Sequence, residues 1–359
     1  MASPTRSVFV SHRSKRTGLL AGTLAVSATV LAGCQVNEQR LLAAPDAAGR
    51  PIPLVVPVVE TAPVASSEDA ADDAVILVAD GDSTAWIAAA DKKFGLRVYD
   101  LDGKEVDTFG IGRLNNVDAV TLGRNRILLA ASNRTNPAIE LFRAEITDDS
   151  LQVTPAGAVL LTLDDPYGLC MTDAGGRISV FVSDKNGRVE EWAIGADLGG
   201  KFLRAFEFGS QTEGCVVDPA GNRLFVGEET VGIWSVDLVS GDMQIVDRVG
   251  AGRLTADVEG LDIYDGRYLL ASSQGDNSFA VYVLEDLRPA GRFRIGPNEA
   301  RGIDGVSETD GIAVTAARLP QFPEGLLVAQ DGLNVAPPEN QNFKLVDWRE
   351  IAAIIAGQE

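Results

Sequence analysis

One pattern recurs six times along the chain: an apolar strand, a short polar segment, and a second strand that often ends in an aromatic residue. The apolar strands begin at residues 86, 127, 178, 223, 268 and 325, so successive repeats are 41 to 57 residues apart. Four strands of about five or six residues, with their turns, need a segment of this length. A sandwich or a solenoid fits the strand pattern but not the period. The sequence therefore predicts an all-β fold, a six-bladed β-propeller with four-stranded blades.

Charge and histidine content exclude several classes of function. The chain has 31 basic and 51 acidic residues, a net charge of −20, which argues against nucleic acid as a partner. Its only histidine is His12, which lies in a segment that we interpret below as a removed leader. Without histidine, the mature protein cannot use the chemistry of histidine phosphatases, Ser-His-Asp hydrolases, Cys-His proteases or imidazole-bound zinc.

Residues 1–33 have the layout of an export signal, with basic residues before an apolar run over 19–32. That run is too short for a membrane-spanning helix. It ends in Leu-Ala-Gly before Cys34, which resembles a bacterial lipobox with Cys34 as the lipidated residue. Ordinary signal cleavage beside an incidental cysteine is the alternative. We expect an exported lipoprotein on the bacterial outer membrane or cell surface, or otherwise a periplasmic or secreted protein, with no membrane contact beyond the anchor.

The rest of the chain divides into two parts. Residues 34–66, which are rich in Ala, Pro and Val, are predicted to form a flexible tether, and residues 67–359 the propeller. Export also implies oxidising surroundings, in which Cys170 and Cys215 could form a disulfide. The sequence alone does not show that their backbones approach each other.

A second repeat, offset from the first, places an acidic residue or its substitute before the innermost strand of a blade. Asp118, Glu213, Glu259 and Asp310 take this position, and Tyr167 takes it in the third blade. A glycine follows four of these five residues. Equivalent positions of successive blades converge on one end of a propeller channel. We therefore expect these side chains to share a small space at the channel mouth.

Crowded carboxylates need protons or cations between them. Two like charges 4 Å apart repel by roughly 4 kcal/mol at an effective dielectric near 20. Oxygen ligands without His or Cys select hard cations, and six to eight flexible oxygens suit Ca²⁺ better than Mg²⁺. A solvated acidic face is the alternative. The register of the acids across blades, beside glycine, favours a calcium site.

Basic and phenolic residues alternate with the acids. Lys92, Arg134 and Lys185 lie in the polar segments of successive blades, and Tyr167 lies beside them. Each residue taken alone would be explained as a surface ion-pair partner. Together, in an acidic mouth, they indicate an anion that is also held by metal.

These segments resemble the β-propeller phytase family, the calcium-dependent, alkaline-type phytases. The likeness extends from about Asp69 to Trp348, nearly the whole mature chain. Any one segment is a weak signal, but many occur in order. They include Asp69-Ala-Ala-Asp72-Asp73, Asp91-Lys92-Lys93, Asn133-Arg134, Tyr167-Gly168, Glu213-Gly214, Glu228-Glu229, Asp257-Val-Glu259-Gly260, Ile303-Asp304 and Asp310-Gly311.

The resemblance implies roles for individual residues. Calcium ligands around the reaction site are expected to be Asp69, Asp72, Glu213, Glu229, Asp257, Glu259, Asp304 and Asp310. Substrate phosphates are expected to be bound by Lys92, Lys93, Arg134, Tyr167 and Lys185. The catalytic set is expected to be Lys92, Arg134, Tyr167, Lys185, Glu213 and Glu259.

The resemblance also implies an activity. A monomer with several bound calcium ions would hydrolyse phytate (myo-inositol hexakisphosphate), bound as its calcium complex, as a 3-phytase-type phosphatase. Metal-activated water would attack directly, without a phosphoenzyme. Departures from the family pattern are the missing Pro and Trp after Asp73, Asn186 after Lys185, and Asp91 beside Lys92.

Two alternatives from other classes remain open. A propeller fold does not fix a function, and the same mouth could serve a non-enzymatic calcium-binding lipoprotein that acts as a binding platform. A calcium-dependent phosphodiesterase or lactonase is the other. The retained phosphate-binding cations argue against the binding platform, because a calcium scaffold does not need them. The phosphodiesterase or lactonase stays open and is tested by comparing phytate with p-nitrophenyl phosphate, a diester and a lactone.

Overall fold

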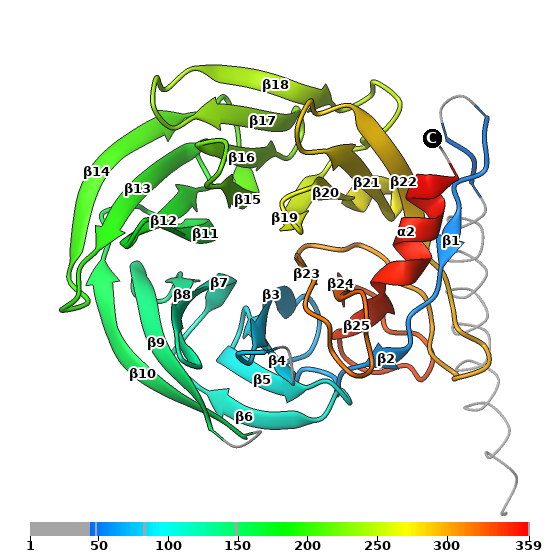
Figure 1. Ribbon diagram of the computed structural model, residues 1–359, viewed down its shortest axis with the longest axis horizontal. Coiled ribbons are helices and arrows are strands. Elements are labelled where there is room, and N and C mark those ends of the chain that lie inside the picture. Colours follow the sequence, from blue (N-terminus) through cyan, green and yellow to red (C-terminus); the bar gives the residue numbers. More distant parts are fainter. Residues whose placement is uncertain (1–43, 47–48, 82–83, 148–149, 358–359) are drawn as a thin grey trace, which may run out of the picture.

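The computed structural model describes residues 44–46, 49–81, 84–147 and 150–357. Within these ranges, six sheets stand around a central channel, each built on four antiparallel strands, and one of them has a fifth, parallel strand at its edge (Figure 1). The predicted six-bladed propeller is therefore confirmed. The predicted signal peptide over 1–33 and the lipidation site Cys34 lie outside the described residues. In the part of the chain that is described, no helix is long and apolar enough to cross a membrane.

The first two strands of each blade lie nearest the channel. The innermost strands are β3 (Ala71–Val78), β7 (Leu114–Gly123), β11 (Pro166–Ala174), β15 (Thr212–Asp218), β19 (Val258–Tyr264) and β23 (Ile312–Thr315). The second strands are β4 (Ala85–Asp91), β8 (Arg126–Asn133), β12 (Arg177–Asp184), β16 (Arg223–Glu228), β20 (Tyr268–Ser273) and β24 (Leu326–Asp331).

The other two strands of each blade complete the sheets toward the rim. The third strands are β5 (Gly95–Asp100), β9 (Ala138–Thr147), β13 (Arg188–Ile194), β17 (Gly232–Asp237), β21 (Ser278–Val283) and β25 (Asn342–Asp347). The outer strands are β6 (Glu105–Phe109), β10 (Ser150–Leu160), β14 (Gly200–Glu207), β18 (Met243–Arg248), β22 (Pro289–Ile295) and β2 (Val59–Glu60).

The apolar runs of the sequence repeat are the second strands. Both faces of these strands are covered by neighbouring blades, so they are apolar almost throughout instead of alternating. In β8, all residues after Arg126 are buried. The cores lie between adjacent sheets: Leu129 of the second blade packs in one cluster with Leu96 and Val98 of the first. The outer strand β10, by contrast, is mostly exposed.

The ring is closed by the N-terminal part of the chain. Strand β2 pairs antiparallel with β25, with Val59 opposite Leu345, and so supplies the fourth strand of the last blade. Strand β1 (Leu54–Val55) runs parallel to β22 and extends the fifth blade. The predicted tether over 34–66 is therefore wrong for these strands, because hydrogen bonds along two sheet edges hold them against the propeller.

Among the described residues, two short helical segments accompany the blades. The 3-10 turn η1 (Gln274–Asp276) follows β20. Helix α2 (Trp348–Ala356) follows β25, where the sequence indicated a short helix, and begins after Asp347, whose side chain accepts a hydrogen bond from the Arg349 amide. Its apolar side packs on the last two blades, and Trp348 stacks on Tyr264 with ring centroids 3.5 Å apart.

Cys170 and Cys215 form a disulfide, with Cα atoms 5.6 Å apart. Cys170 lies in β11 and Cys215 in β15, so the bond joins the innermost strands of the third and fourth blades. The pairing that the sequence left open is thus present. It fixes two neighbouring strands that each carry a residue of the channel mouth.

We expect loss of this disulfide to lower stability by about 2–4 kcal/mol, because the bond restricts the unfolded chain. The measurement is the melting temperature of wild type and of a Cys170→Ala/Cys215→Ala variant, each with and without dithiothreitol. The reductant should lower the melting temperature of the wild type and leave that of the double variant unchanged. Equal melting of oxidised and reduced wild type would contradict a stabilising role.

Candidate active site

The register between the first two strands brings equivalent residues to one end of the channel. Pairing breaks near the start of each of the first five innermost strands. From there, Ala74, Val117, Leu169, Cys215, Leu261 and Ile312 pair with the second strands. Irregular pairing of this kind re-aims a side chain. The residues two positions earlier form what we call the mouth ring: Asp72, Asn115, Tyr167, Glu213, Glu259 and Asp310.

Glycine after the mouth-ring residue lets neighbouring blades approach closely. A Cβ atom on Gly168 would lie 1.8 Å from the Glu213 carbonyl oxygen, and one on Gly214 would lie 2.0 Å from that of Glu259. No side chain fits at such distances. The acid–glycine repeat of the sequence is therefore a packing requirement as well as a chemical one.

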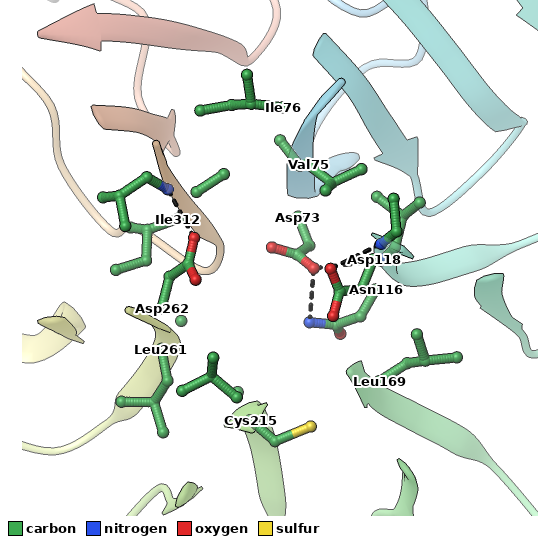
Figure 2. A pocket seen from close by; sticks show the side chains of 18 of the residues that line it. Asp73, Val75, Ile76, Asn116, Asp118, Leu169, Cys215, Leu261, Asp262 and Ile312 are labelled. Atoms are coloured by element: carbon green, nitrogen blue, oxygen red, sulfur yellow. Dashed lines mark hydrogen bonds between the residues drawn. The ribbon is translucent and has the colours of Figure 1, made fainter. Parts of the chain in front are cut away.

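The second blade differs from the prediction. Asn115, and not Asp118, takes the mouth-ring position, because Asp118 lies three residues further along β7. Figure 2 shows Asp118 with Asp73 and Asp262 in the channel below the mouth. Asp118 accepts a hydrogen bond from the Met171 amide at 2.7 Å and so joins β7 to β11. Burial raises the pKa of Asp118 to about 6 and that of Asp262 to about 7.

Three glutamates gather in the mouth. Glu213, Glu229 and Glu259 are buried, and one carboxylate oxygen from each lies within 4.8 Å of the others. Oε2 of Glu259 is buried without a hydrogen-bond partner. Burial and the charge of Glu213 raise the pKa of Glu259 well above its usual value, and the same two causes raise the pKa of Glu229 to about 7. In the absence of a cation, protons therefore relieve the repulsion.

Lys92 joins the aspartates on the other side of the ring. Its Nζ lies 2.6 Å from Asp310, 2.9 Å from Asp69 and 3.2 Å from Asp72. Burial raises the pKa of Asp72 well above its usual value, although Lys92 opposes the shift. Burial also raises the pKa of Asp310 to about 6. Burial lowers the pKa of Lys92, but the surrounding carboxylates outweigh it and the net shift is upward.

Two cations lie on the ring of Tyr167. The Lys185 Nζ is 4.2 Å from the ring centroid and the Arg134 Cζ is 5.2 Å from it. Burial and the charge of Glu213 raise the pKa of Tyr167, so the phenol is neutral and can donate a hydrogen bond. We call Arg134, Tyr167 and Lys185 the cation arm.

The remaining predicted site residues are less central. Asp257 lies close enough to Glu229 to raise the pKa of that carboxyl, whereas Asp69 is an exposed partner of Lys92, with 72 % of its side chain accessible. Lys93 donates to the Ser67 carbonyl oxygen at 2.5 Å.

Asp304 lies outside the three-glutamate cluster of the mouth, and its role as a calcium ligand stays a prediction. It pairs instead with buried Lys344, whose Nζ also lies 2.6 Å from Asp331. The Lys344 ammonium is thus a buried counter-charge for both aspartates.

Several polar residues of the site were missed from the sequence. Gln274 directly follows β20, just as Lys92, Arg134, Lys185 and Glu229 follow their second strands. Its Nε2 donates to Asp310 at 2.6 Å. The spacing from the apolar strand could have identified it. Gln211, which donates to Glu229 at 2.5 Å, and Asp165, which binds Arg134, carried no such signal.

Comparisons with known proteins agree with this geometry. The model of the phytase family matches residues 21–359. A curated relative, "3-phytase" of Bacillus subtilis (strain 168), is 39 % identical over 320 residues, covering 82 % of this chain and 83 % of the relative. Among solved structures, a chain of the crystal structure of a nidogen/laminin complex has a TM-score of 0.46 at 14 % identity, covering 62 % of this chain and 80 % of its own length. That likeness is too low to support any conclusion. The family match and the curated relative show that this chain belongs to the phytase family.

Proposed function

We propose that this protein is a 3-phytase-type phosphatase that releases phosphate from phytate with calcium held in the mouth ring. The observation that carries the proposal is that a group of acidic residues able to hold metal lies beside a group of residues able to bind phosphate. Buried carboxylates with unpartnered oxygens face a cation arm across one small mouth. The similarity to a curated 3-phytase supports the same reaction.

The donor atoms fit calcium. The mouth offers carboxylate oxygens from Asp72, Glu213, Glu229, Glu259 and Asp310, and the described part of the site has no imidazole or thiol donor. Oδ1 of Asp72 and Oε2 of Glu259 are buried without a hydrogen bond, whereas Oδ2 of Asp72 lies 3.2 Å from the Lys92 ammonium. Burial of such oxygen atoms costs free energy unless a cation or a proton binds to them. Flexible, oxygen-only sites suit Ca²⁺. Bound calcium would neutralise phosphate oxygens and acidify a water molecule.

The side chains of this chain would bind and orient the substrate. Lys92, Arg134 and Lys185 present N–H donors to phosphate oxygens and stabilise the charge that develops during in-line transfer. Tyr167 adds a neutral hydroxyl donor. Neighbouring carboxylates keep Lys92 charged, since they raise its pKa. We propose direct attack of water on phosphorus, without a phosphoenzyme.

The setting of the reaction is proposed on the same basis. Phytate would arrive as its calcium complex, since its phosphates would otherwise meet the acidic mouth without compensation. We propose a monomer that is exported and anchored through a lipid on Cys34.

Phosphate release from phytate across a calcium titration tests the proposal. The rate should rise with calcium and return to background when a chelator is added. p-Nitrophenyl phosphate, a phosphodiester and a lactone serve as comparison substrates and should react far more slowly. Calcium binding without phosphate release would show a binding platform instead, and preference for the diester or the lactone would place the protein in another enzyme class.

A further inference from the structure

The guanidinium of Arg134 is hydrogen-bonded to two residues, Asp165 and Asn115, to which the function proposed above assigns no role. Asp165, just before β11, forms a two-bond pair with it, from Nε at 2.8 Å and from Nη2 at 2.9 Å. The Tyr167 ring covers one face of the group. The side-chain oxygen of Asn115 accepts a third hydrogen bond, from Nη1 at 3.1 Å. Arg134 is therefore held by its own blade and by the next one.

Asn115 connects this cation to the metal-binding carboxylates. The side chain is fully buried, and while its oxygen accepts from Arg134, its Nδ2 donates to Glu213 Oε1 at 2.6 Å. An amide can serve both partners only in this orientation. A continuous series of hydrogen bonds thus runs from Asp165 through Arg134 and Asn115 to Glu213.

Part of the guanidinium stays available to a ligand. An arginine has five N–H donors, and three of those of Arg134 are used by Asp165 and Asn115. The side chain is 12 % exposed. A phosphate oxygen can accept from the remaining donors while Asp165 stays bound, so substrate binding need not break the pair.

We propose that Asp165 and Asn115 are positioning residues, which fix Arg134 relative to Glu213 so that a phosphate bound by the arginine meets the metal site in one orientation. The proposal rests on the proposed function, because it takes Arg134 to bind substrate phosphate. The competing view is that Asp165 is only an anion that competes with substrate for Arg134. The two views predict opposite changes in KM.

Asp165→Asn tests the proposal, because it keeps the size of the side chain and removes its charge. We expect the KM for phytate to rise about tenfold while kcat changes less than about threefold, since a charge-assisted two-bond pair is lost and binding of the phosphate weakens. Asp165→Glu should recover part of the loss. Asp164→Asn is the matched control: it removes the same charge from the exposed preceding residue, which has no hydrogen bond to Arg134. The control should leave KM unchanged or slightly lower.

Asn115→Ala removes the hydrogen bonds that link Arg134 to Glu213. It should raise both the KM for phytate and the calcium concentration needed for half the maximal rate, whereas Asp165→Asn should raise KM alone. A KM for Asp165→Asn that is lower than wild type, or equal to that of Asp164→Asn, overturns the proposal whatever Asn115→Ala does. A wild-type enzyme that releases no phosphate from phytate would instead contradict the proposed function, before any variant is compared.

Discussion

Glu259→Gln should lower kcat/KM for phytate hydrolysis about a thousandfold while the propeller stays folded. Glu259 contributes a buried oxygen without a hydrogen-bond partner to the three-glutamate cluster. An amide keeps the shape but offers a neutral oxygen, so the site loses one negative charge that binds the metal and, through it, the transition state. Phosphate release at saturating calcium gives the measurement.

The melting temperature separates this effect from simple unfolding. Without metal, Glu259→Gln should melt at or above the wild-type temperature, because one member of a group of crowded carboxylates has become neutral. Glu145→Gln, at an exposed position on β9, is the control and should keep wild-type activity. Normal turnover in Glu259→Gln would remove Glu259 from the site.

Calcium should raise the melting temperature, and the increase should grow as the pH rises from about 5 to 8. In the metal-free protein the pKa of Asp310 is raised by burial to about 6 and that of Glu229 to about 7. A carboxyl with a raised pKa in the folded state destabilises that state as the pH rises from its unfolded value through its folded value. Over the same pH window the proposed calcium ligands would lose their protons and bind the ion more tightly.

The size of this effect follows from mass action. At a calcium concentration about a hundred times Kd, one site contributes about 2.7 kcal/mol. That corresponds to a shift of roughly 4 °C for a domain of about 300 residues. Thermal melts with calcium and with EDTA, at several pH values, provide the measurement. A calcium effect that is absent, or that shrinks toward pH 8, would contradict a carboxylate site for the metal.

The fold was predictable because its signal is periodic. Six apolar strands at one-blade spacing define the ring, and the acid–glycine pairs at Glu213, Glu259 and Asp310 identify the mouth. The prediction for the second blade was wrong because Asn116 occupies the position at which those blades have glycine. Without the glycine, the nearest acid, Asp118, was taken for the ring residue, three positions too far along. The mouth-ring residue of this blade was chosen because it is acidic, and not because its position in the strand register matches that of the other blades.

Other parts of the structure depend on contacts between distant segments. Strands β1 and β2 have two residues each, too few to show any alternation, and their pairing is visible only once the ring closes. Asp304 pairs with Lys344, which lies 40 residues further along the chain. The pair of Asp165 with Arg134 likewise joins neighbouring blades. Local patterns carry no information on such partners.

The way the ring closes has a mechanical consequence. The seam between the ends of the chain consists of a two-residue strand, β2, beside β25. It is reinforced by charge, because Lys344 of β25 lies 3.8 Å from Glu60 of β2. Short seams of this kind are the first to open in local fluctuations. Because β1 precedes β2 in the chain, tension on the N-terminal end would act first on β1 at the edge of the fifth blade and next on the β2 seam of the sixth, before it reached any other part of the propeller.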